Sequence, residues 1–99
     1  MKPYFFHPAA EEEFVAAAEY YRSVDPALAV AFFEEVESVI VHIRCFPAAG
    51  VKIDAGIRRS LLSRFPYGVL YEERPGDIRI LALMHLHRRP NYWEQRAEK

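Results

Sequence analysis

Cysteine, glycine, lysine and long apolar runs are all scarce in this chain. The single cysteine, Cys45, permits no internal disulfide, which favours a reducing compartment and a cytoplasmic location. Nowhere do about eighteen apolar residues follow one another, and the N-terminus turns acidic after a few apolar residues. We therefore expect neither a membrane span nor a secretion signal.

The motifs of metal and cofactor sites are missing too. The four glycines do not form a phosphate-binding loop, and no serine stands in a nucleophile-elbow pattern. His85 and His87 are one closely spaced pair without the second cluster that a zinc site needs. We predict no metal and no cofactor. Because no helix carries a basic recognition face, direct specific binding of duplex DNA is not expected either.

The net charge of -1 hides an asymmetry along the chain. Residues 1–50 carry three basic and eight acidic groups, whereas residues 51–99 carry ten basic and six acidic groups. Eight of those ten basic groups are arginines, which favours bidentate contact with phosphate or carboxylate. Solvated acidic helix faces beside a sheet with solvated arginines remain an alternative explanation.

Two consecutive helices are predicted in the first half. From Pro8 on, apolar residues recur at helical spacing, with proline suited to the first turn. Asp25 and Pro26 supply an N-cap and a first-turn proline for a second helix, which Phe46–Pro47 would end. The inward-facing positions are Ala10, Phe14, Ala17, Ala18 and Tyr21 in the first helix and Ala29, Phe33, Val36, Ile40 and Ile43 in the second, where Leu28, Phe32 and Val39 widen the stripe.

Strand patterns flank this helical hairpin. Residues 4–6 predict a first strand, and after the second helix the period of the apolar residues falls to about 2. Three more strands are predicted as an antiparallel meander, over Ile57–Phe65, Val69–Glu73 and Ile78–Met84, with a type II turn at Arg74–Asp77. Helices on one face of such a sheet give an α+β two-layer sandwich, and residues 1–99 are expected to form a single domain.

Alternation along the strands assigns their side chains to two faces. In the first strand of the meander, Arg58, Ser60 and Arg64 are expected to point away from the helices. Arg59 then falls on the apolar face, which leaves open a specific partner, a strand bulge or a wrong phase. The outer face, with Leu62 on it, is expected to be exposed or covered by another chain. In the last strand, one face would carry Ile78, Ile80, Ala82 and Met84.

The stretch Met84–Arg96 concentrates histidine, arginine and aromatic side chains. We expect Pro90 to begin a helical turn and Trp93 to seal the end of the sheet. The remaining candidates for a functional edge are His85, Arg88, Arg89 and Tyr92. This edge is expected to lie close to Arg58 and Arg64.

The order strand, helix, helix and three strands, joined to particular residues, resembles the RelE/ParE superfamily of bacterial type II toxin–antitoxin toxins. The matching positions span nearly the whole chain, and the ordered series RR…FPY…Y…H..RRP.YW..R is their most specific part. They are Glu12, Glu19, Tyr20, Tyr21, Phe46, Pro47, Arg58, Arg59, Phe65, Pro66, Tyr67, Tyr71, His85, Arg88, Pro90, Tyr92, Trp93 and Arg96.

The resemblance implies a small toxin that a cognate antitoxin neutralises by covering its basic surface. RelE-like members enter the ribosomal A site and cleave mRNA, whereas ParE-like members inhibit DNA gyrase without cleaving nucleic acid. The C-terminal motif is similar to that of ParE-like, plasmid-stabilisation toxins, which favours gyrase inhibition. Ribosome-dependent mRNA cleavage is the alternative, and a non-toxic partner-binding module of the same fold is a further one.

Whether the chain is an enzyme stays open, but the residue types that a ribonuclease needs are present. Activating a 2′-hydroxyl and protonating a leaving oxygen suit histidine and tyrosine, so the catalytic candidates are His85, Tyr92 and Arg58. The candidates for binding the target or its phosphates are Arg58, Arg59, Arg64, Arg88 and Arg89. Against catalysis, lysines number only three, and His-Leu-His at 85–87 differs from the adjacent His-Tyr pair of some ribonuclease members.

Overall fold

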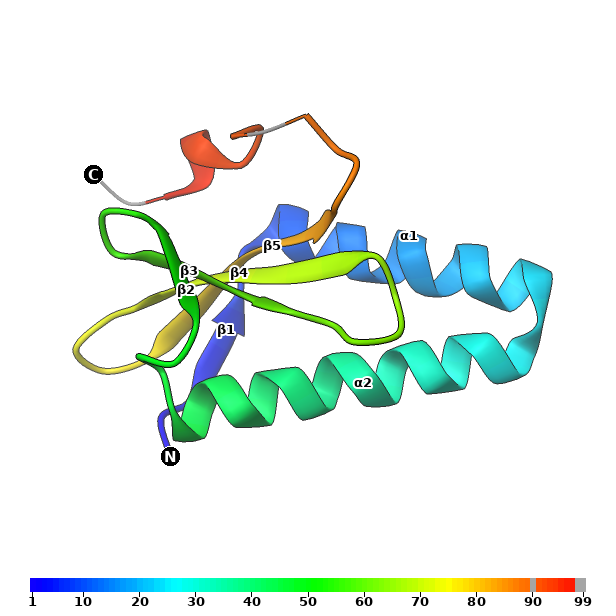
Figure 1. The fold of residues 1–99 in the computed structure, drawn as a ribbon, viewed down its shortest axis with the longest axis horizontal. Helices are drawn as coiled ribbons and strands as arrows, with labels where there is room; N and C mark the ends of the chain where they lie inside the picture. Colours follow the sequence, from blue (N-terminus) through cyan, green and yellow to red (C-terminus); the bar gives the residue numbers. More distant parts are fainter. Residues whose placement is uncertain (90, 98–99) are drawn as a thin grey trace.

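The computed structural model describes residues 1–89 and 91–97. Along the chain lie β1 (Tyr4–Phe6), α1 (Pro8–Val24), α2 (Pro26–Cys45), β2 (Val51–Asp54), β3 (Ile57–Leu61), β4 (Tyr67–Glu73), β5 (Ile78–His85) and a short 3₁₀ helix, η1 (Glu94–Arg96). The strands form a five-stranded sheet in the order β1-β5-β4-β3-β2, parallel between β1 and β5 and antiparallel elsewhere. The predicted α+β class is confirmed, with the helical hairpin along one face of the sheet (Figure 1).

Both helices begin where the sequence predicted. Asp25 caps α2, because its Oδ1 accepts the N–H of Ala27 at 3.0 Å and Pro26 follows in the first turn. The cap of α1 was not predicted: Nδ1 of His7 accepts the N–H of Ala9 at 3.0 Å. Neither helix is long and apolar enough to cross a membrane, as far as residues 1–89 and 91–97 are concerned.

The main core lies between the helical hairpin and the inner face of the sheet. The helix stripes predicted from periodicity supply it: Phe32, at the margin of the predicted stripe, is fully buried, whereas Phe33 is 45% exposed. The buried members are Ala10, Ala17, Phe32, Val36, Ile40 and Ile43 from the helices and Leu62, Phe65, Val69, Tyr71, Ile78, Ile80 and Leu83 from the sheet and its loops.

Strand β2 and the extent of β3 differ from the prediction. The segment Val51–Asp54 was not predicted as a strand, because it is short and three of its four residues are exposed. It pairs with β3 only as far as Arg59, which lies opposite Val51. Strand β3 ends at Leu61 rather than Phe65. The Arg74–Asp77 turn joins β4 to β5, but Gly76 lacks the positive φ of a type II turn, so the predicted turn type is wrong.

The predicted phase of β3 is also wrong. Arg58 and Ser60 lie opposite Tyr71 and Val69, whose side chains belong to the core beneath the helices. Both therefore lie on the helix side of the sheet, together with Leu62. Polar residues are tolerated there because Arg58 lies near the sheet edge, where its Nη1 donates to the C=O of Gly50 at 2.8 Å. The outer face of β3 carries Ile57, Arg59 and Leu61.

A bulge in β5 changes the alternation of that strand. Leu70 pairs with Ala82, but the next residue of β4, Tyr71, pairs with Ile80, which leaves Leu81 as an extra residue. Leu81 and Ala82 both belong to an outer-face cluster, whereas Leu83 faces the helices. The predicted common face of Ile78, Ile80, Ala82 and Met84 therefore ends at Ile80.

The chain itself covers part of the outer face, which was expected to be exposed or covered by another chain. Residues 91–97, here called the C-terminal segment, lie on the side of the sheet opposite α2 (Figure 1). Trp93 packs as predicted and is 3% exposed. Its neighbours in the outer cluster are Ile57, Leu70, Leu81 and Ala82. The predicted start of a helical turn, Pro90, lies outside the described residues.

Candidate functional site

A small basin lies between α1 and the ends of β4 and β5, with a volume of about 210 Å³. Two residues of the predicted functional edge, His85 and Arg88, line it. Ala16 and Ala17 on α1 leave room for it because their side chains are short. The full lining is Glu13, Ala16, Ala17, Tyr20, Tyr67, Leu83, His85 and Arg88, and we call it the β5 basin.

His85 and Tyr67 face each other across β4 and β5. They are register partners, and their rings meet edge-on with centroids 5.0 Å apart. Nδ1 of His85 accepts the N–H of His87 at 3.1 Å, so in the neutral imidazole the proton sits on Nε2. Burial, with Tyr21, Tyr20 and Glu13 adding to it, raises the pKa of Tyr67. The basin therefore presents a neutral tyrosine hydroxyl beside an imidazole and a guanidinium group.

Tyr92 lies between this basin and the outer cluster. Arg88 and Arg96 both contact its ring, with guanidinium carbons 4.2 and 5.0 Å from the centroid. Its hydroxyl is buried, next to the Glu13 carboxylate and the Arg96 guanidinium group. Burial, and then the Glu13 carboxylate, raises the pKa of Tyr92 far above its usual range. Tyr92 therefore stays protonated near neutral pH, which does not suit a general base.

Glu13 is the residue at this site that the sequence reasoning missed. Its carboxylate accepts Nη1 and Nη2 of Arg96, both at 3.0 Å, and the backbone N–H of Leu83 at 3.1 Å. A signal was present in the sequence: Glu13 lies three residues after Ala10 and four before Ala17, so it is a carboxylate on the inward face of α1.

Arg58 is not brought together with His85. Their partners on β4 are Tyr71 and Tyr67, which are four residues apart and hence about 13 Å along the strand. Strands β3 and β5 lie on opposite sides of β4, which adds about 10 Å across the sheet. The catalytic candidates His85, Tyr92 and Arg58 therefore do not share one site.

The other predicted arginines lie in three different places. Arg64 follows β3 in a loop, with its guanidinium carbon 5.8 Å from the centroid of the Phe65 ring. Arg59 lies on the outer face of β3, where its Nε is buried without a hydrogen-bond partner among the described residues. Arg89 is exposed, next to Arg88.

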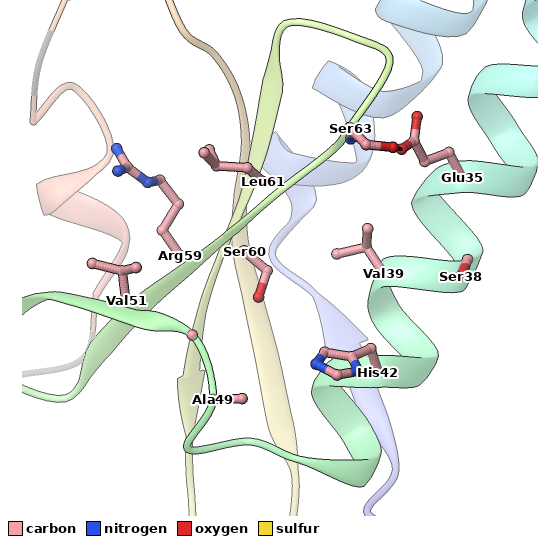
Figure 2. Close-up of a pocket in the computed structure, with 11 residues that line it drawn as sticks. Glu35, Ser38, Val39, His42, Ala49, Val51, Arg59, Ser60, Leu61 and Ser63 are labelled. Carbon is pink, nitrogen blue, oxygen red and sulfur yellow. Dashed lines mark hydrogen bonds between the residues drawn. The ribbon is translucent and has the colours of Figure 1, made fainter.

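A larger groove of about 620 Å³ separates α2 from the edge formed by β2 and β3 (Figure 2). Ser60 points into it towards α2, whereas Arg59 points away on the other side of β3. Glu35 closes one end by accepting the N–H of Ser63 at 2.6 Å, and its pKa falls because bonds from Ser63 and Arg64 outweigh the opposing effect of burial. The groove could not be predicted, since it depends on β2 ending opposite Arg59.

Within residues 1–89 and 91–97, no group of three or more His, Cys, Asp or Glu side chains is arranged to hold a metal ion. The polar side chains that line the β5 basin include the hydroxyl group of Tyr67, the imidazole of His85 and the guanidinium group of Arg88. These groups donate hydrogen bonds and, in the case of Arg88, positive charge, which suits contact with an acidic or phosphate-bearing surface.

Comparison with known proteins agrees with this architecture. A solved structure described as a chromosomal ParDE TA system from P. aeruginosa is similar with a TM-score of 0.75 at 16% identity, covering 88% of this chain and 98% of that chain. This likeness shows the fold. No curated protein matches the sequence. The model of the family described as the ParE toxin of the type II toxin–antitoxin system parDE matches residues 4–90. The chain thus belongs to the ParE toxin family of type II toxin–antitoxin systems.

Proposed function

We propose that this protein is a growth-arresting toxin that inhibits DNA gyrase by binding it, and that a cognate antitoxin neutralises it. Membership of the ParE family carries the proposal, because gyrase inhibition without cleavage is the activity that the ParE-like branch implies. Gyrase as a target places the activity in the cytoplasm.

The distribution of the arginines supports binding over cleavage. A ribonuclease needs its acid, base and phosphate-binding cation around one phosphate, whereas Arg58 lies about 13 Å along the sheet from the level of His85. Because Tyr92 stays protonated, it does not serve as the general base of such a ribonuclease. His85 and Arg88 at the basin, with Arg89 exposed beside them, suit contact with an acidic protein surface.

An antitoxin partner follows from the same family and from the charges. The second half of the chain is rich in arginine, and antitoxin segments of this superfamily are often acidic. Arg59 adds a positive charge to the outer face of β3, which an acidic antitoxin segment can cover.

A supercoiling assay with purified gyrase tests the proposal. The wild-type chain is expected to inhibit supercoiling and the antitoxin to restore it. Arg88→Ala and His85→Ala are expected to weaken inhibition about tenfold, as loss of a central interface anchor does. Lys52→Ala removes one positive charge from the other end of the sheet and is expected to inhibit like the wild type.

Ribosome-dependent mRNA cleavage is tested in the same arrested cells by mapping mRNA ends. We would abandon gyrase inhibition in favour of a ribonuclease activity under two conditions. The wild-type chain would have to cut mRNA within translated codons while gyrase is unaffected, and the cuts would have to disappear in Arg58→Ala and His85→Ala. If cells grow normally while they contain the folded chain and no antitoxin, the protein is a non-toxic binding module in that host.

A further inference from the structure

The far edge of β5 is completed by side chains instead of a strand. Strand β1 pairs with β5 only from Ile78 to Ile80, and the N–H of His7 then takes the C=O of Ile80 at 2.8 Å. Beyond that point, Leu81 C=O accepts Nη1 of Arg96 at 3.0 Å, and Leu83 N–H donates to Glu13 at 3.1 Å. Two side chains that bind each other thus occupy the place of a neighbouring strand.

The Glu13–Arg96 pair is well satisfied for a buried one. The two side chains are 16% and 15% exposed, and the guanidinium group binds both carboxylate oxygens. A buried ion pair stabilises only when its remaining donors and acceptors find partners, and here Leu81, Leu83 and the Tyr92 ring supply them. The pair also bridges distant segments, since Glu13 is on α1 and Arg96 is in the C-terminal segment.

The C-terminal segment depends on such anchors because it has little structure of its own. Its only helix, η1, is three residues long, and the described residues 91–97 add no strand to the sheet. Trp93 provides an apolar anchor on the outer cluster, and Arg96 provides the charged one. Between them and the basin, Arg88 stacks on Tyr92.

We propose that Glu13 and Arg96 are positioning residues: their ion pair fixes the C-terminal segment on the sheet and so presents Arg88, stacked on Tyr92, at the rim of the β5 basin. What the basin binds rests on the function proposed above. The role of Glu13 and Arg96 in holding the C-terminal segment is independent of that function.

Trp93 reports the position of the segment, because it is the only tryptophan in the chain and is 3% exposed. Acrylamide quenching of its fluorescence is measured in the full chain with Glu13→Gln, Arg96→Ala and Arg96→Lys. Glutamine keeps an acceptor for Leu83 N–H but loses the charge, and lysine keeps the charge but cannot bind both carboxylate oxygens and Leu81 C=O together.

The matched control is Glu19→Gln, which breaks the exposed Glu19–Arg22 pair on the same helix. Circular dichroism establishes that each variant keeps its helices. We expect quenching to rise about threefold or more in Glu13→Gln and Arg96→Ala, less in Arg96→Lys, and not at all in Glu19→Gln, because only the Glu13–Arg96 pair connects α1 to the segment. Unchanged quenching in both Glu13→Gln and Arg96→Ala, or an equal rise in Glu19→Gln, would overturn the proposal.

Gyrase inhibition gives the second measurement. Glu13→Gln is expected to inhibit about tenfold less well than the wild type, with Arg96→Lys between the two. Full potency in a variant whose Trp93 is exposed would show that the basin works without a fixed segment and would overturn the positioning role. A wild-type chain that does not inhibit gyrase would refute the proposed function instead, and quenching would still decide whether the pair holds the segment. If Glu13→Gln does not fold, Arg96→Lys decides both measurements.

Discussion

The hydroxyl oxygen of Tyr71 accepts the backbone N–H of Gly50 at 3.1 Å, although the two residues lie 21 positions apart. The same hydroxyl donates to the C=O of Pro47 at 2.7 Å. Burial raises the pKa of Tyr71, so the donor proton is retained near neutral pH. One phenol group on β4 thereby fixes the loop that carries the chain from α2 into β2.

Tyr71→Phe is expected to lower the free energy of unfolding by about 1–3 kcal/mol, because two loop groups lose their partner. Urea unfolding followed by circular dichroism measures the change. Tyr20→Phe removes a hydroxyl from a residue that is 62% exposed and is expected to leave stability unchanged. Equal losses in the two variants would contradict the role given to Tyr71.

Gly50→Ala is expected to be destabilising for a steric reason. An added Cβ would lie 3.0 Å from Cε1 of Tyr71 and 3.1 Å from the backbone oxygen of Arg59, and closer still to the Tyr71 hydroxyl. Neither neighbour is free to move, so we expect a loss of about 1–3 kcal/mol in thermal or urea unfolding. Gly76→Ala is the control, since nothing lies within 4 Å of its added Cβ. A neutral Gly50→Ala would show that the loop can shift.

Stability is expected to fall below about pH 6.5 because of His7. Burial, with Arg79 and Arg96 adding to it, lowers the pKa of His7 from its ordinary value of 6.5. The unfolded chain then binds more protons than the folded chain between the two pKa values, so this contribution is complete above pH 6.5 and is lost as the pH falls towards the folded pKa. Protonation of Nδ1 would also remove the acceptor that caps α1.

His7→Asn keeps a capping acceptor that does not titrate. The slope of unfolding free energy against pH between about 7.5 and 5 is expected to be smaller in His7→Asn than in the wild type. Parallel slopes for the two chains would mean that another group causes the pH dependence.

Arg59→Met is expected to weaken antitoxin binding without changing the stability of the fold. Methionine keeps an apolar stem over Gly68, whose added Cβ would lie 3.2 Å from Cγ and Cδ of Arg59. Because Nε of Arg59 has no partner among the described residues, we expect unfolding to change by less than about 0.5 kcal/mol. Antitoxin binding, measured by calorimetry, is expected to weaken about tenfold.

The neighbouring Arg58→Met is the contrasting variant. It removes the bond to the C=O of Gly50, so a loss of about 1 kcal/mol in stability is expected. If Arg59→Met were the less stable of the two, Arg59 would be a structural residue after all.

The helices could be predicted because their signals are local. Asp25 and Pro26 lie next to each other in the sequence, and the apolar stripes repeat within a few residues. The faces of the strands could not be assigned in the same way. The phase of β3 depends on which face the helices cover, and the switch in β5 depends on the bulge at Leu81, which no sequence period shows.

The same difference between local and long-range signals explains which parts of the candidate site could be predicted. His85 and Arg88 lie close together in the sequence, and both do line one basin. Arg58 was expected beside them because its strand was correctly placed in the meander, but its level along the sheet depends on the register with β4. Glu13 and Arg96 are 83 positions apart, so their pairing needed the fold.

The parallel pairing of β1 with β5 has a consequence for how the chain is made. Tyr4 meets Ile78, so β1 has no strand to pair with until most of the chain has been synthesised. The two helices can form earlier, since their contacts are close in sequence, but the sheet cannot close until β5 has left the ribosome. Such distant contacts slow folding. The closed sheet, and with it the β5 basin at the end of β5, is therefore the last part of the fold to form as the chain is made.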